Sequence, residues 1–178
     1  MLESLFPSLS EKEAAFWFCC AVLWFIWVFS RFLKSYFTSP NLMGTSDFEL
    51  QVSKTVFVHE VICWCVKNLG LPPRSKALPN VVLRYYRHQK LMGTYLHRGK
   101  VITLYWGSHS TIIEVINTLI HEYQHFLDIR KDQDSREYDK ETALLGYYRN
   151  PFERRARQVA NRSEKLCLRF MIKKGLLK

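Results

Sequence analysis

The chain has 178 residues, 48% of them hydrophobic and 24% charged, and a formal net charge of +10. This length allows one ordinary core plus an appendage, and the lack of repeated, low-complexity or Pro/Gly-rich stretches excludes fibrous and disordered classes. The five cysteines include no CxxC pair, so neither a disulfide framework nor a cysteine zinc site is indicated, and a reducing compartment fits best.

The N-terminal region contains an uncharged apolar stretch, residues 14–30, with three Trp and four Phe. Phe32 and Leu33 extend it, and no polar face interrupts it as it would in a buried core helix. We therefore predict one membrane span at about residues 14–33. The leader carries acidic residues where a cleavable signal peptide needs positive charge, so the span is expected to remain as an anchor.

The charges flanking this stretch predict its orientation. Arg31 and Lys34 follow it, whereas only Lys12 precedes it. The positive-inside rule then places the rest of the chain in the cytoplasm as part of a single-pass membrane protein. The expected organisation is an anchor at 1–38, a linker at 39–46 and one α+β domain at 47–178.

The domain is expected to begin with a helix from Asp47 to about Asn68. His59 and Cys63 stand at i and i+4 on that helix, but a packed cysteine is a commoner arrangement than a metal ligand. Three runs rich in β-branched and aromatic residues follow at 81–85, 93–97 and 101–106. The last two are expected to pair as a hairpin in a three-stranded sheet packed on the next helix.

The helix predicted over 111–130 carries the pattern HEYQH. Thr111 and Glu114 form a capping-box signature ahead of an apolar run, which marks the helix start. His121 and His125 would leave one face a turn apart and could bind one Zn²⁺, with Glu122 beside the metal as a general base. His97 and His109 are candidate neighbours of this site, although a surface or structural role is the commoner one for a lone histidine.

The segment after this helix is highly charged from Lys131 to Lys140 and is expected to be exposed, with a short helix at 141–148. Asn150, Pro151 and Glu153 then form a typical helix start. Glu153 has two interpretations, a capping-box glutamate or the third metal ligand. The predicted inward face of that helix is traced by Ala156, Ala160, Ser163, Cys167 and Phe170. Glu153 lies at the head of this face, which favours the metal ligand because a buried carboxylate needs a cation.

Other carboxylates remain alternatives for the third ligand. Asp128 shares the motif face, but it lies about 10 Å of helix rise beyond His121, so we expect it to support the site from outside the ligand set. The remaining alternatives are Asp132, Asp134, Glu137 and Glu141.

The pattern HEYQH, the preceding strand pair and YYRNPFERRA together resemble compact zincin metallopeptidases of the gluzincin type over about residues 80–165, and they are also similar to SprT-like and phage-antirepressor peptidases. The resemblance implies one Zn²⁺ held by His121, His125 and Glu153, with Glu122 as base. It also implies an edge strand that binds an extended substrate, for which Gly93, Thr94 and Tyr95 are the candidates. The metzincin pattern is not met.

The sequence therefore predicts a membrane-anchored zinc endopeptidase acting on a protein or peptide, in which Tyr147 or Tyr148 stabilises the oxyanion. Residues 149–178 hold ten Lys/Arg and two Glu. This basic segment could face nucleic acid, anionic lipid or an acidic partner, although a solvated helix face is the commoner explanation. It suggests a second hypothesis, a nucleic-acid-associated module whose zinc centre is structural or whose protease acts on DNA-bound proteins, which a membrane span disfavours. A third is an inactive pseudoenzyme or a small-molecule hydrolase on the same scaffold.

Overall fold

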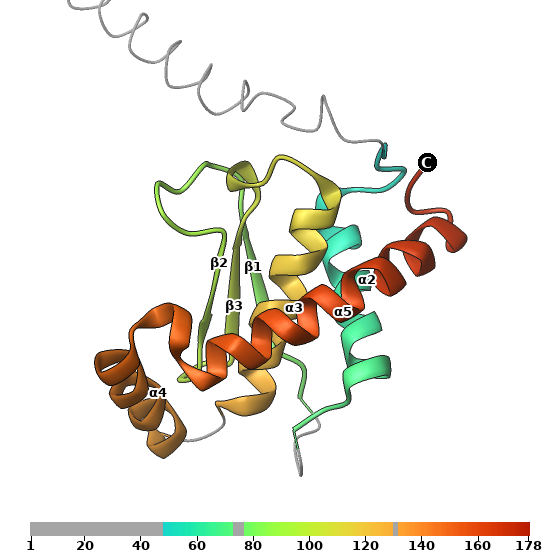
Figure 1. Ribbon diagram of the computed structural model, residues 1–178. Coiled ribbons are helices and arrows are strands. Elements are labelled where there is room, and N and C mark those ends of the chain that lie inside the picture. The colour runs from blue at the N-terminus through green and yellow to red at the C-terminus, as the bar shows by residue number, and fades with distance from the viewer. Residues whose placement is uncertain (1–47, 73–76, 130–131) are drawn as a thin grey trace, which may run out of the picture. The chain divides into compact units, whose positions relative to one another are not determined.

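The computed structural model describes residues 48–72, 77–129 and 132–178, which fall within one compact unit, 42–178 (Figure 1). Its elements are α2 (Lys54–Leu69), β1 (Asn80–Arg84), β2 (Gly93–Leu96), β3 (Val101–Tyr105), η1 (Trp106–Ser108), α3 (Ile112–Asp128), α4 (Asp132–Leu145), η2 (Tyr147–Arg149) and α5 (Pro151–Lys173). The predicted α+β class is confirmed for this unit.

The predicted anchor, its span at 14–33 and the linker at 39–46 all lie outside the described residues. Within the described ranges, no helix is both long enough and apolar enough to cross a bilayer.

The three strands form one sheet in the order β1-β3-β2. β2 and β3 are antiparallel, with Gly93 opposite Leu104 and Leu96 opposite Val101, which confirms the predicted hairpin. β1 joins the other side of β3 in parallel. Among the described strands, β2 is therefore an edge strand.

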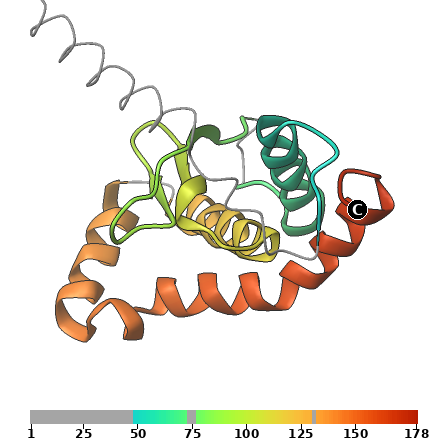
Figure 2. The same ribbon diagram turned by 90° about the horizontal axis from the view of Figure 1, so that it is seen from above.

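α3 occupies the centre of the domain. Its start is the predicted capping box: the Thr111 side chain accepts from the backbone N–H of Glu114, and the Glu114 carboxylate accepts from that of Thr111. The helix lies between the sheet and α5 (Figure 2), so its apolar side chains are covered from both directions. Fully buried side chains include Ile112, Ile116, Leu119, Ile120 and Tyr123.

The first of the described helices, α2, begins later than predicted. Ser53, rather than Asp47, caps α2, and its side chain accepts from the backbone N–H of Val56. The residues just before it instead pair with the C-terminus, where Leu50 forms an antiparallel bridge to Leu177. The segment just before α2 is thus held by a pairing between residues more than a hundred positions apart, which local capping signals do not report.

The segment after α3 differs from the prediction in its helix bounds, because one continuous helix, α4, takes the place of a short helix at 141–148. Most of the described side chains at 133–140 are exposed, as expected. Its C-terminal part is held by the buried side chain of Asn150, whose amide donates to the Tyr138 carbonyl at 3.1 Å and to Thr142 Oγ1 at 2.7 Å. This helix is stabilised by a residue that follows it in the chain, which its own charged sequence does not reveal.

Candidate metal centre

Two imidazoles from consecutive turns of α3 meet at their Nε2 atoms. His121 Nε2 lies 3.1 Å from His125 Nε2. Both rings leave the same helix face because four residues make slightly more than one turn. The His121 side chain is 13% exposed and that of His125 is 7% exposed, so both are largely withdrawn from solvent.

The third side chain comes from the first turn of α5. Asn150 caps this helix by accepting from the Phe152 N–H, and Pro151 occupies the first helical position, where no N–H is needed. Glu153 does not cap its own helix, since the Asn150 N–H donates to the Gly146 carbonyl instead. Its carboxylate faces the histidines and is 2% exposed.

The contacts of Glu153 are divided between the two imidazoles. Oε2 lies 3.2 Å from His121 Nε2, and Oε1 lies 3.2 Å from His125 Nε2. These contacts favour the metal-ligand interpretation over the capping one. Burial alone would raise the pKa of Glu153, but contacts with His121, His125 and Tyr138 hold it well below its usual value, so the carboxylate is ionised.

These three residues fit a zinc centre. Donor atoms held at about 2.0–2.1 Å from one Zn²⁺ with tetrahedral angles stand about 3.3 Å apart. The two imidazole nitrogens stand 3.1 Å apart, close to that value, and each lies 3.2 Å from a different oxygen of Glu153. With one donor atom taken from each residue, all three lie within 4.8 Å of one another. Two facing imidazole nitrogens and a buried carboxylate form a donor set that zinc prefers, and they are the one such grouping of three among the described residues.

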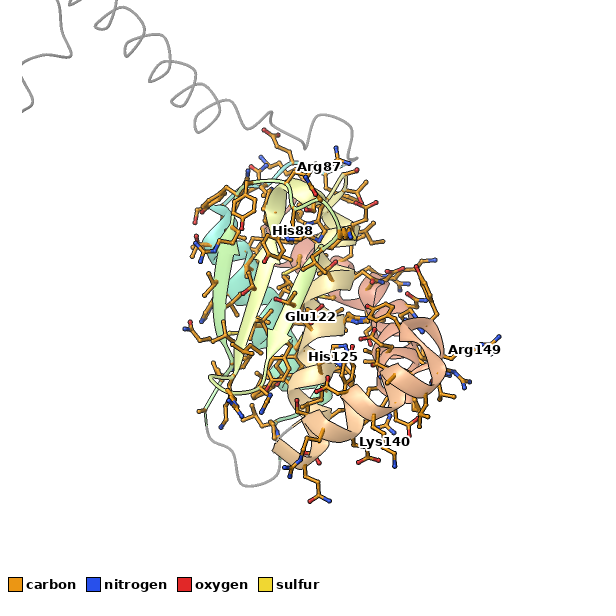
Figure 3. All side chains as sticks on the ribbon, turned by 90° about the vertical axis from the view of Figure 1, so that its left-hand side faces the viewer. Arg87, His88, Glu122, His125, Lys140 and Arg149 are labelled. Atoms are coloured by element: carbon orange, nitrogen blue, oxygen red, sulfur yellow. The ribbon has the colours of Figure 1, made fainter. Side chains whose placement is uncertain are left out.

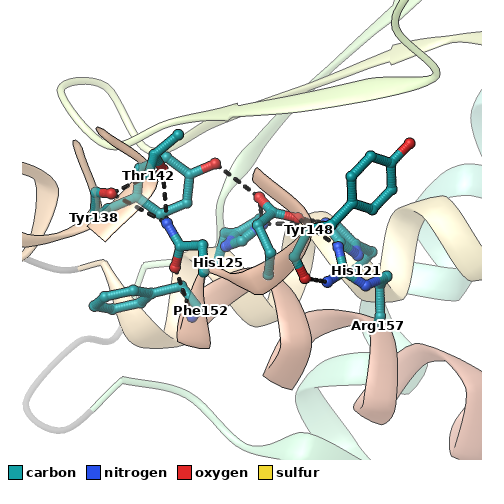
Figure 4. A network of polar contacts seen from close by, with 9 residues as sticks. His121, His125, Tyr138, Thr142, Tyr148, Phe152 and Arg157 are labelled. Carbon is teal, nitrogen blue, oxygen red and sulfur yellow. Dashed lines mark hydrogen bonds and ion pairs between the residues drawn. The ribbon is translucent and has the colours of Figure 1, made fainter. Parts of the chain in front are cut away.

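Two side chains support Glu153 from outside the donor set (Figure 4). The Tyr138 hydroxyl on α4 donates to Oε1 at 2.7 Å, and its ring packs edge-on against His125. Arg157, one turn further along α5, lies with NH1 3.6 Å from Oε2. Its NH2 group donates to the Tyr148 carbonyl, and its guanidinium lies over the Tyr147 ring. Oε1 is therefore fixed by a hydrogen bond from α4, whereas outside the donor set Oε2 has only an ion-pair contact with Arg157.

Glu122 lines a cleft of about 310 Å³ beside the histidines, together with His125, Tyr147 and Glu153. Figure 3 shows Glu122 and His125 between the sheet and the helices α4 and α5. Burial raises the pKa of Glu122 to about 7, which its neighbour His121 partly opposes. A carboxylate in this position can exchange a proton with a molecule bound in the cleft.

The candidate substrate strand forms the opposite wall of this cleft. Gly93, Thr94 and Tyr95 of β2 all line it. Gly93 sits directly on α3: a Cβ there would stand 2.7 Å from Thr118 Cγ2 and 3.0 Å from Glu122 Cγ. The missing side chain lets the edge strand approach the helix at the position of Glu122.

The two tyrosines proposed for the oxyanion differ in position. Tyr147 lines the cleft and is only half-buried, and this partial burial together with Glu153 raises its pKa, so its hydroxyl keeps its proton at neutral pH. Tyr148 is 80% exposed and does not line the cleft. Its ring meets that of Tyr147 edge to face, and the Arg157 guanidinium lies over it. Tyr147 is the better placed of the two.

The remaining candidates, apart from His97, do not line the cleft. Asp128, expected near the site, pairs with Arg155 at 3.1 Å. His109 is buried between the Tyr105 carbonyl and Thr118 Oγ1 as a structural histidine. His97 lines the cleft. The alternative ligands Asp134, Glu137 and Glu141 and the His59 and Cys63 pair do not belong to the metal-binding grouping.

Sequence reasoning missed Tyr138 and Arg157. Tyr138 is the one aromatic residue in the charged run 131–140, an isolated feature that could have identified an inward-facing position. Arg157 stands four residues after Glu153, the spacing of an ion pair on one helix face, but its place among the many cations of residues 149–178 hides this role.

Comparison of the chain with protein-family models, curated proteins and solved structures gave no match in any of the three. Its resemblance to zincin peptidases thus stays a prediction from the motifs, and the geometry of the site carries the functional argument.

Proposed function

We propose that this domain is a zinc-dependent endopeptidase, held at a membrane by the span predicted at residues 14–33. One observation carries the proposal: His121, His125 and Glu153 converge from two helices within bonding reach of one ion, and Glu122 lines the cleft beside them. Four polar side chains buried together in this way are costly to a fold unless they perform a function.

The residues divide into binding and proton-transfer roles. His121, His125 and Glu153 would hold the ion, and Zn²⁺ in such a centre supplies Lewis acidity toward a carbonyl and lowers the pKa of a nearby water. Glu122 accepts the proton of the attacking water and returns it to the leaving amine. The protonated Tyr147 hydroxyl donates a hydrogen bond to the oxygen that becomes negative as the carbonyl is attacked.

The substrate class follows from the edge strand. The outer edge of β2 has no strand partner among the described residues and borders the cleft. An extended peptide can pair with such an edge through its own backbone groups. Because Gly93 adds no side chain, a peptide paired there would have its carbonyl close to Glu122, which favours a polypeptide over a small-molecule substrate.

The test compares the purified full chain with its Glu122→Gln and Glu137→Gln variants on a peptide library read by mass spectrometry. The wild type and both variants are expected to bind about one zinc. Glu122→Gln should lose at least about 10²-fold in cleavage rate, because the amide cannot accept a proton, while the exposed Glu137 is dispensable. Zinc-loaded wild type without cleavage, or Glu122→Gln with the wild-type rate, would contradict the proposal.

A further inference from the structure

The solvent-facing side of α5 carries a continuous row of cations. Five exposed residues make up this basic stripe: Arg154, Arg162, Lys165, Arg169 and Lys173. Their spacings of eight, three, four and four residues keep them within about 100° of arc on an α-helix, and the row runs for about 28 Å. Nearly the whole length of the helix thus presents positive charge in one direction.

This charge is not neutralised within the described part of the chain. The acidic residues of α5 are used elsewhere: Glu153 faces the histidines, and Glu164 accepts from the side chain of Asn117 at 2.6 Å. The ion pairs of nearby basic residues involve Arg155 with Asp128 and Lys174 with Glu60, neither of which belongs to the stripe. The five cations are therefore available to an external polyanion.

The neighbours of the stripe indicate which polyanion fits. Leu166 and Ile172 flank it and are 56% and 41% exposed. Apolar side chains beside a basic row are typical of helices that lie in the headgroup layer of a bilayer. Proteins that track single-stranded nucleic acid place aromatic side chains among their cations, and the stripe has none.

We infer that the basic stripe of α5 is a docking surface for an anionic lipid bilayer, with the helix axis parallel to the membrane. α5 lies on the side of α3 away from the sheet (Figure 2), so the exposed row can approach a flat surface. The cleft lies on the opposite side, between β2 and the residues Glu122 and Glu153, so a bilayer on the basic stripe would not cover it. Docking in this orientation would let the domain act on polypeptides close to a membrane surface.

The test measures lysine acetylation rates by mass spectrometry on the full chain, mixed with vesicles of phosphatidylcholine alone or with added phosphatidylserine. Each cation near an anionic surface strengthens binding about fivefold. Five such cations together strengthen binding by about 10³-fold, so most of the protein is held on anionic vesicles, where Lys165 and Lys173 should be acetylated at least about tenfold more slowly. Molar salt should remove the difference because the Debye length falls to about 3 Å. Lys90 and Lys100, exposed on the loops of the sheet, serve as internal controls whose rates stay unchanged.

Two charge-reversal variants sharpen the comparison. Arg162→Glu with Arg169→Glu should abolish the protection of Lys165, whereas Lys90→Glu with Lys100→Glu, the same change in net charge, should leave it intact. Equal acetylation rates on neutral and anionic vesicles would overturn the inference. Equal or greater protection by duplex DNA at the same charge concentration would overturn the assignment to lipid in favour of nucleic acid.

Discussion

The hydroxyl of Tyr138 donates a 2.7 Å hydrogen bond to Oε1 of Glu153, which links α4 to the carboxylate that faces the two histidines. The same ring packs against His125. A hydrogen bond of this kind fixes the orientation of a ligand before the metal binds. α4 is therefore part of the candidate site although its sequence is almost entirely polar.

Replacing Tyr138 with Phe should weaken zinc binding by about 10-fold or more, because partners of metal ligands typically contribute 10–100-fold to affinity. Competition with a chromogenic chelator measures the affinity. Tyr148→Phe is the matched control, since that ring is 80% exposed and outside the cleft. Equal zinc affinities of the two variants would argue against a supporting role for Tyr138.

Gly93→Ala should destabilise the domain by about 1–3 kcal/mol, the usual cost of overpacking, because its Cβ would lie 2.7 Å from Thr118 Cγ2. Thr118→Ser removes that methyl group and keeps the hydroxyl that contacts His109. Urea unfolding of the two single variants and the double variant should reveal a favourable coupling in the double. If the changes in unfolding free energy of the two single variants simply add in the double variant, the contact between residue 93 and the Thr118 methyl group does not limit stability.

Arg157→Lys should lower kcat by about tenfold while zinc content stays unchanged. Arg157 donates to the Tyr148 carbonyl and lies over the Tyr147 ring, so it positions η2 over the cleft, and lysine lacks the planar fork that makes these contacts together. Steady-state kinetics on a cleaved peptide, beside Arg154→Lys on the exposed face, provides the measurement. A change in KM alone, or no change in either constant, would show that Arg157 does not position Tyr147 for catalysis.

The stability of the domain should fall in acid partly through His109. Burial lowers the pKa of His109 below 6.5, although the Tyr105 and Trp106 carbonyls and Glu114 oppose this effect. The unfolded chain then binds a proton more readily, so the contribution of His109 is complete above pH 6.5 and decreases as the pH falls toward the folded-state pKa. His109→Gln should flatten the pH dependence of the unfolding free energy measured in urea, whereas superimposable profiles would contradict this.

The core of the candidate site was predictable because its signals are local. The capping box of Thr111 and Glu114 fixes the start of α3, and the spacing of His121 and His125 then places both on one face. Asn150 and Pro151 likewise fix the start of α5 and so the position of Glu153. Each prediction needed only a few neighbouring residues.

The features that sequence reasoning missed depend on distant contacts. α2 begins at Lys54 because the preceding residues pair with the C-terminus, and α4 is held by Asn150 from the next helix. The role of Tyr138 depends on that packing, since only the folded chain brings α4 to Glu153. The sequence of α4 has too few apolar residues for their spacing to indicate which face packs inward.

The most direct test of the metal centre is elemental analysis of zinc in the purified wild type beside Glu153→Ala, Glu137→Ala and Glu141→Ala. Each variant lacks one carboxylate of the wild type, but of the three glutamates only Glu153 contacts both histidines. We predict about one zinc per chain in the wild type and in the Glu137 and Glu141 variants, and almost none in Glu153→Ala. A Glu153→Ala chain that keeps its zinc as fully as the wild type would contradict the proposed centre.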